Sequence, residues 1–168
     1  AFIRAMLVNI KRGGIVQGGS TITQQLAKNL FFSFDKTWVR KFKELLMAFQ
    51  IESTFPKEEI LEAYSNLVYF GNGAYGVDEA SIVYFGKRSR NLTLLQAAVL
   101  AGTVRSPNKF NPFNDRALAM RRAGTVLSRM VSEGFIDKHQ KGHALNSDLG
   151  LIKRRTKYNN NHYFVDAV

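Results

Sequence analysis

The sequence predicts a mainly helical protein, and three features support this fold class. Apolar residues recur at helical spacing in several segments, two T-x-x-Q capping boxes mark helix starts, and the connections between the expected helices are short. A chain of 168 residues can also bury a core, and about two thirds of its unfolded surface should be buried on folding. We therefore expect one modest helical domain.

The first expected helix follows a glycine turn at Gly18 and Gly19, and Thr21 with Gln24 fits the reciprocal capping pattern at its start. Its apolar residues form one row, while its other rows carry hydroxyls, uncharged amides and one cation. That chemistry suits a sugar phosphate, although an ordinary amphipathic helix with a good cap has the same pattern. The polar rows are Ser20, Gln24 and Lys28, and beside them Thr21, Gln25 and Asn29.

A second helix is expected from Trp38 to Phe49, and its apolar spacing predicts a stripe that faces the core. Another face carries two cations and a carboxylate, and two interpretations of it are open. One is a solvated face with an i,i+4 ion pair worth a few tenths of a kcal/mol. The other is a carboxylate held between cations that bind a phosphate. The stripe is Val39, Phe42, Leu46 and Phe49, and the charged face is Arg40, Lys41 and Glu44.

Pro56 suits the first turn of a third helix, and the glycines that follow it predict a loop with special backbone angles. The helix should bury one apolar face, and the carboxylates of its first turn favour its positive end. We expect both features to be structural. The buried face is Ile60, Leu61, Tyr64, Leu67 and Val68, and the glycines are Gly71, Gly73 and Gly76.

The second half of the chain predicts two more helices and then a polar connection. Thr93 and Gln96 form a capping box before the apolar stretch 94–100, which should be the central buried element. Asp115 should cap a long helix that ends at Gly134. From about residue 137 the chain becomes polar and includes a run of basic residues, which indicates an exposed connection.

Five segments together carry a family resemblance: GGSTITQQLAKN, RKFKE, EEILEAYSN, YFGNGAYGV and YFGK. In this order and spacing they resemble the family 51 glycosyltransferases that polymerise peptidoglycan, domains found in bifunctional penicillin-binding proteins and in monofunctional glycosyltransferases. The resemblance covers about residues 1–136 and implies a mainly helical, lysozyme-like fold with a small hydrophobic lobe. Residues 137–168 would then be a polar linker toward the transpeptidase domain of a bifunctional parent.

The resemblance implies that a glycan chain on an undecaprenyl pyrophosphate donor is transferred to the 4-hydroxyl of lipid II, with inversion at the anomeric carbon. Glu44 matches the second of the family's two essential glutamates, and it would organise the basic groups or stabilise positive charge that develops near the sugar. Arg105 stands where many relatives have a substrate-binding lysine. The other implied substrate-binding residues are Ser20, Gln24, Gln25, Lys28, Asn29, Arg40 and Lys41.

The family's general base is a glutamate in an E-D-x-x-F motif before the glycine turn, whereas this chain has no acidic residue before Asp35. We expect a fragment of a longer protein that lacks this first catalytic motif at its N-terminal side. The alternative is a substrate-binding fragment without catalysis. In either case the isolated chain should bind substrate-like ligands but turn over poorly.

The formal charge of +11, from 24 Lys and Arg against 13 Asp and Glu, favours an anionic partner. No helix-turn-helix, RNA-binding or zinc-finger signature is present, so we expect a membrane surface and pyrophosphate rather than nucleic acid. The partners that the family resemblance implies are lipid II, the nascent glycan strand and the donor mimic moenomycin. The family resemblance implies a location at the periplasmic face of the bacterial cytoplasmic membrane, with the anchor outside this chain. Residues 2–12 fit an interfacial segment or a core helix.

Three other functions have weaker support. Ser33 to Lys36 fits the S-x-x-K motif of transpeptidases, but no K-T-G or K-S-G follows. His139 and His143 stand four apart without a nearby Glu or Cys, so a solvated surface explains them better than zinc. Lytic enzymes with a lysozyme-like core have less use for several cations. We expect no cofactor, although a divalent cation such as Mg²⁺ could assist the departure of pyrophosphate, as in some relatives.

Overall fold

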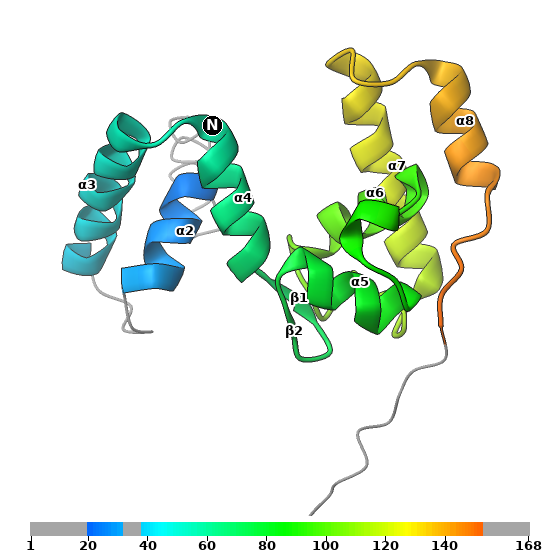
Figure 1. The fold of residues 1–168 in the computed structure, drawn as a ribbon, viewed down its shortest axis with the longest axis horizontal. Coiled ribbons are helices and arrows are strands. Elements are labelled where there is room, and N and C mark those ends of the chain that lie inside the picture. Colours follow the sequence, from blue (N-terminus) through cyan, green and yellow to red (C-terminus); the bar gives the residue numbers. More distant parts are fainter. Residues whose placement is uncertain (1–19, 32–37, 153–168) are drawn as a thin grey trace, which may run out of the picture. The chain divides into compact units, whose positions relative to one another are not determined.

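The computed structural model describes residues 20–31 and 38–152, and these form mainly helices, as predicted (Figure 1). The chain divides into two compact units, Ala1–Ala80 and Ser81–Val168. Within the described ranges, no helix has both the length and the apolarity needed to cross a bilayer. The elements are α2 (Ile22–Phe31), α3 (Trp38–Thr54), α4 (Lys57–Leu67), β1 (Tyr69–Gly71), β2 (Ala74–Tyr75), α5 (Val77–Phe85), a 3-10 turn (Ser89–Asn91), α6 (Leu94–Thr103), α7 (Arg116–Ser132) and α8 (Lys138–Asn146).

In the first unit, α2 lies between α3 and α4 and contacts both (Figure 1). Leu26 and Ala27 of α2 are buried, as are Ala48 of α3 and Ile60 of α4. The small side chains of Ala27 and Ala48 allow the helices to approach closely. This packing leaves the start of α2 next to the polar inner face of α3, where the candidate site lies.

The predicted core stripe of α3 is wrong. Val39, Phe42, Leu46 and Phe49 are 65%, 61%, 55% and 74% exposed, and we call them the outer face of α3. The inner face instead carries Glu44, Ala48 and Ile51, all of which are buried. Helical periodicity identifies an apolar face but not what covers it, and α2 contacts the mixed face of α3 rather than the apolar one. Large apolar side chains therefore remain on the surface of this unit.

The predicted buried face of α4 is correct in part, because Ile60, Tyr64 and Val68 are buried whereas Leu61 and Leu67 are exposed. Pro56 lies at the N-cap position, just before the first turn where it was expected.

The glycine-rich segment forms the antiparallel β1–β2 hairpin, which the sequence analysis did not predict. The special backbone angles expected there are confirmed, since Gly71, Gly73 and Gly76 all have positive φ. At Gly76 a Cβ atom would lie 2.6 Å from the Asn66 carbonyl oxygen, so the close approach of two backbones also requires glycine.

The second unit is built around α6, as predicted. Leu95, Val99 and Leu100 are almost fully buried, and α6 contacts both α7 and α8. The capping box is confirmed, because the backbone N–H of Gln96 donates to Thr93 Oγ1 while the side-chain Oε1 of Gln96 accepts from the backbone N–H of Thr93. The long helix after it also begins as expected, with the Asp115 carboxylate accepting from the Leu118 N–H.

Residues 138–146 differ from the polar connection expected after residue 137, because they form α8 and contact α7. Asp137 and Gln140 close a capping box at 2.7 and 2.9 Å, and Ala144 and Leu149 are buried. The Gln96 side chain donates to the Leu149 carbonyl oxygen at 2.9 Å. The capping box and the buried side chains of Ala144 and Leu149 thus hold this mostly polar segment in contact with the rest of the second unit. The basic run expected at residues 153–155 lies outside the described residues.

Candidate functional site

The inner face of α3 places the carboxylate of Glu44, only 1% exposed, between two cations of the same helix. Glu44 Oε2 accepts a hydrogen bond from Lys41 Nζ at 2.8 Å. Glu44 Oε1 lies 3.0 Å from Arg40 Nε, where the N–H is not aligned for a hydrogen bond, so this contact is an ion pair. The buried Glu44 carboxylate thus holds the charged groups of Arg40 and Lys41 in position.

The start of α2 reaches the same place. Lys41 Nζ also donates to Ser20 Oγ at 2.9 Å, which joins α3 to the residue two positions before α2. Ser20 is exposed and the Lys41 side chain is 41% exposed, so a ligand can approach both. We call Ser20, Arg40, Lys41 and Glu44 the Glu44 cluster.

Gln24 and Gln25, predicted to bind substrate, both have partners within the protein. Gln24 is buried, and its Oε1 accepts from the Thr21 N–H while Thr21 Oγ1 accepts from the Gln24 N–H, each at 3.2 Å. This is the predicted capping box. Gln25 Oε1 accepts from the Tyr64 hydroxyl at 3.1 Å. Burial raises the pKa of Tyr64. Because Gln25 uses its Oε1 in this bond, its side-chain N–H groups can donate to a ligand.

The remaining predicted site residues lie at the end of α2 and in the second unit. Lys28 is half-buried in the last turn of α2, and Asn29 beside it is exposed. Arg105 belongs to the second unit, where it is exposed in the turn after α6. Burial lowers the pKa of Arg122, and the positive charge of Arg105 lowers it further. The structure therefore places Arg105 near another cation of its own unit.

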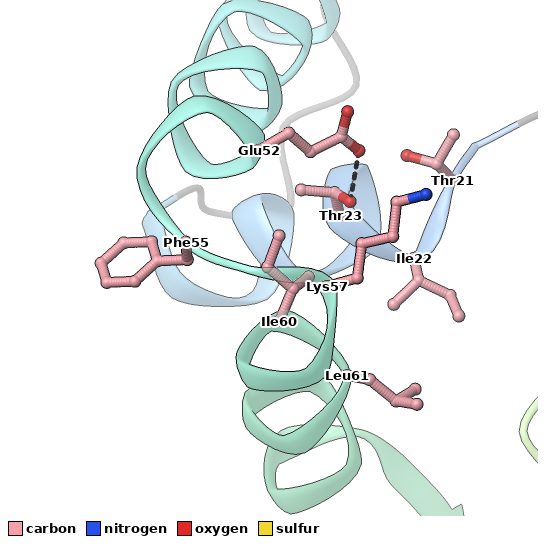
Figure 2. A pocket seen from close by; sticks show the side chains of 8 residues that line it. All are labelled: Thr21, Ile22, Thr23, Glu52, Phe55, Lys57, Ile60 and Leu61. Atoms are coloured by element: carbon pink, nitrogen blue, oxygen red, sulfur yellow. Dashed lines mark hydrogen bonds between the residues drawn. The ribbon is translucent and has the colours of Figure 1, made fainter.

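The first unit also contains a pocket of about 620 Å³ that was not expected from the sequence (Figure 2). Its polar lining includes Glu52, whose Oε1 accepts a hydrogen bond from Thr23 Oγ1 at 2.6 Å. A sequence signal was available, because Glu44, Ala48 and Glu52 recur at spacing four and so share one face of α3. The lining residues are Thr21, Ile22, Thr23, Glu52, Phe55, Lys57, Ile60 and Leu61.

Two further sequence motifs remain to be placed. His139 and His143 are exposed on α8, and within residues 20–31 and 38–152 no three His, Cys, Asp or Glu side chains gather as metal ligands. The S-x-x-K motif at Ser33 lies outside the described residues.

The geometry of the Glu44 cluster suits an anion rather than a proton transfer by Glu44. Both carboxylate oxygens are engaged with cations and are buried, so Glu44 is poorly placed to accept a proton from a substrate. Lys41 and Ser20 present an ammonium and a hydroxyl at the surface, and such groups bind phosphate oxygens. Of the two roles expected for Glu44, the geometry favours organising the basic groups.

The family model and the similar proteins all point to the same family. The transglycosylase family matches residues 1–131. Penicillin-binding protein 1A of Aquifex aeolicus (strain VF5) is 49% identical over 168 residues, which are 100% of this chain and 23% of that protein. Penicillin-binding protein 1A of Neisseria gonorrhoeae is 43% identical over 146 residues, 87% of this chain and 18% of that protein.

A solved structure agrees with these sequence matches. The 2.6 Å crystal structure of penicillin-binding protein 1A from Haemophilus influenzae has a TM-score of 0.55 and 35% identity, and the match covers 61% of this chain and 16% of that one. The chain thus spans less than a quarter of the length of these relatives.

Proposed function

Because this chain belongs to the transglycosylase family, we propose that the protein of which it forms part polymerises peptidoglycan precursors. In detail, the glycan chain on an undecaprenyl pyrophosphate donor is transferred to the 4-hydroxyl of lipid II with inversion. The relatives bear the name penicillin-binding protein 1A, which connects them with cell-wall synthesis. The described residues supply the part of the site that holds the departing pyrophosphate.

The Glu44 cluster is the observation that carries this proposal. Negative charge develops on the pyrophosphate as its bond to the sugar breaks, and cations already in place stabilise this charge without reorganising. Glu44 holds Lys41 Nζ at 2.8 Å, and Ser20 holds the same ammonium at 2.9 Å. A lysine that two residues fix in position loses less rotamer freedom when it binds the ligand.

The outer face of α3 supports a site at a membrane surface. Its exposed apolar side chains lie on one side of an amphipathic helix, and such a helix can lie in the interfacial region of a bilayer. A lipid-linked substrate is presented at that surface, and the charge of +11 favours anionic headgroups. The proposed location is therefore the periplasmic face of the bacterial cytoplasmic membrane, with the outer face of α3 toward the lipid.

The test is polymerisation of lipid II by the full-length parent protein and its Glu44→Gln variant. Losing the charge of Glu44 releases Lys41 and Arg40 from their positions, so kcat should fall by on the order of 100-fold. Lys138→Gln, an exposed position on α8, is the control for a change of one charge and should leave kcat unchanged. Normal activity of Glu44→Gln would contradict the proposed role of the cluster.

A further inference from the structure

The pocket between the start of α2, the end of α3 and the start of α4 is lined by one acidic and one basic side chain, which do not form an ion pair with each other. Lys57 and Glu52 both line it, and Figure 2 shows their side chains extending toward Thr21 and Thr23. Among the described residues neither takes part in an ion pair. Glu52 Oε1 is engaged by the Thr23 hydroxyl, which leaves Oε2 to accept from a ligand. The pocket therefore offers one anionic and one cationic contact.

The rest of the lining is mostly apolar. Ile22, Ile60 and Leu61 contribute aliphatic side chains, and Phe55 contributes an aromatic ring. Ile22, Phe55 and Leu61 are all exposed, so burying them under a ligand would be favourable. A volume of about 620 Å³ lies within the range of small-molecule sites.

We propose that this pocket binds a short peptide carried by the glycan substrate. A carboxylate of the peptide pairs with Lys57, an ammonium or amide N–H donates to Glu52, and a side chain contacts Ile60 and Leu61. Other ligand classes match the lining less well. A phosphate group could pair with Lys57 but would offer no donor to Glu52, and a hydrocarbon chain would leave both charges without partners. A peptide with a free carboxylate satisfies both charges and the apolar surface.

The position of the pocket supports a ligand shared with the Glu44 cluster. Ser20 belongs to that cluster, and the next three residues, Thr21, Ile22 and Thr23, line the pocket. The segment at the start of α2 thus contributes residues to both the Glu44 cluster and the pocket. The glycan of peptidoglycan is substituted with short peptides, so a precursor held by its pyrophosphate at the cluster would bring a peptide to this side of α2. This inference rests on the proposed function.

The experiment measures polymerisation by the full-length parent with two substrates, a lipid-linked disaccharide that carries its peptide and the same molecule without the peptide. For Lys57→Gln, KM for the peptide-bearing substrate should rise about three- to fivefold, the scale of one partly exposed charge pair. KM for the peptide-free substrate should be unchanged. Lys87→Gln, in the second unit, is the matched control and should change neither value.

The possible outcomes separate the two proposals. If the wild-type protein polymerises neither substrate, the proposed function fails. If it polymerises both and Lys57→Gln alters both KM values equally or neither, the peptide pocket is refuted. Free peptides supply a second readout, because a peptide acid should inhibit polymerisation of the peptide-bearing substrate and its C-terminal amide should inhibit less. Equal inhibition by the acid and the amide would also overturn the assignment of the carboxylate to Lys57.

Discussion

The two units of this chain differ in what they bury. The second unit buries large apolar side chains, including Tyr84, Leu95, Leu100 and Leu127, each at most 1% exposed. The first unit also buries apolar side chains such as Phe70, but it adds the carboxylate of Glu44, and the outer face of α3 is exposed. The contrast indicates that the second unit is organised for stability and the first for contact with ligands and a surface.

The buried polar groups of the two units also serve different purposes. In the second unit, Gln96 and Thr103 donate to backbone carbonyl oxygens and so stabilise the fold itself. In the first unit, Glu44 pairs with cations that remain partly exposed. A buried charge contributes little net stability when its desolvation is included, so its retention is better explained by the cations it positions.

The largest expected effect is on the free energy of unfolding, and it is tested with one apolar residue from each unit. Leu95→Ala should lower the free energy of unfolding by about 2–5 kcal/mol, because it leaves a cavity in the core around α6. Phe42→Ala, on the outer face of α3, should change it by less than about 0.5 kcal/mol. Chemical denaturation of the chain measures both values. Equal losses would show that the outer face of α3 is covered in solution, and the comparison would fail.

A second prediction concerns the surface that the outer face of α3 contacts. Phe49→Ser should weaken association with anionic lipid vesicles by about tenfold, because roughly 1.4 kcal/mol of apolar burial is lost. Phe135→Ser, an equally exposed phenylalanine of the second unit, is the control and should have no effect on the association. Co-sedimentation with vesicles provides the measurement. If the two variants lose association to the same extent, the lipid contact is not specific to α3.

The smallest effect concerns Tyr64, whose pKa burial raises above the ordinary value of 10.0. The folded protein holds this proton to a higher pH than the unfolded chain does, so its contribution to stability is present below pH 10 and declines as pH rises further. Tyr64→Phe removes the hydrogen bond to Gln25, at a cost of about 1 kcal/mol near neutral pH. The variant should also lose less stability than wild type above pH 10, as measured by urea denaturation across pH. A parallel loss in both proteins would contradict this role of Tyr64.

Local signals in the sequence predicted most of the helices and their starts. Capping depends on residues three positions apart, so Thr21 with Gln24, Thr93 with Gln96, and Asp115 were identified without knowledge of the fold. α8 was missed for the opposite reason, because few of its residues are apolar and Leu149, which helps to hold it, lies beyond its end.

Periodicity could not reveal which face of α3 is covered. The spacing of Val39, Phe42, Leu46 and Phe49 is that of a core stripe, yet these residues are exposed. Which face packs against α2 depends on contacts between distant segments, such as Thr23 with Glu52, which lie 29 positions apart. The ion pairs of Glu44 lie within one turn of helix, so local spacing suffices to predict them as one alternative. The hydrogen bond from Lys41 to Ser20 joins α3 to a segment 21 positions away, before α2, and local spacing does not reveal it.

We infer that Ser20, two residues before α2, and Lys41 of α3 act together in a single anion site. The most direct test is a double-mutant cycle on moenomycin binding by the full-length parent, with Ser20→Ala, Lys41→Met and the double variant. If Ser20 acts by positioning Lys41, the double variant should bind within about threefold of Lys41→Met alone, because the second change removes nothing further. If the double variant loses affinity by the product of the two single-variant losses, Ser20 and Lys41 act independently, and that result would contradict this account.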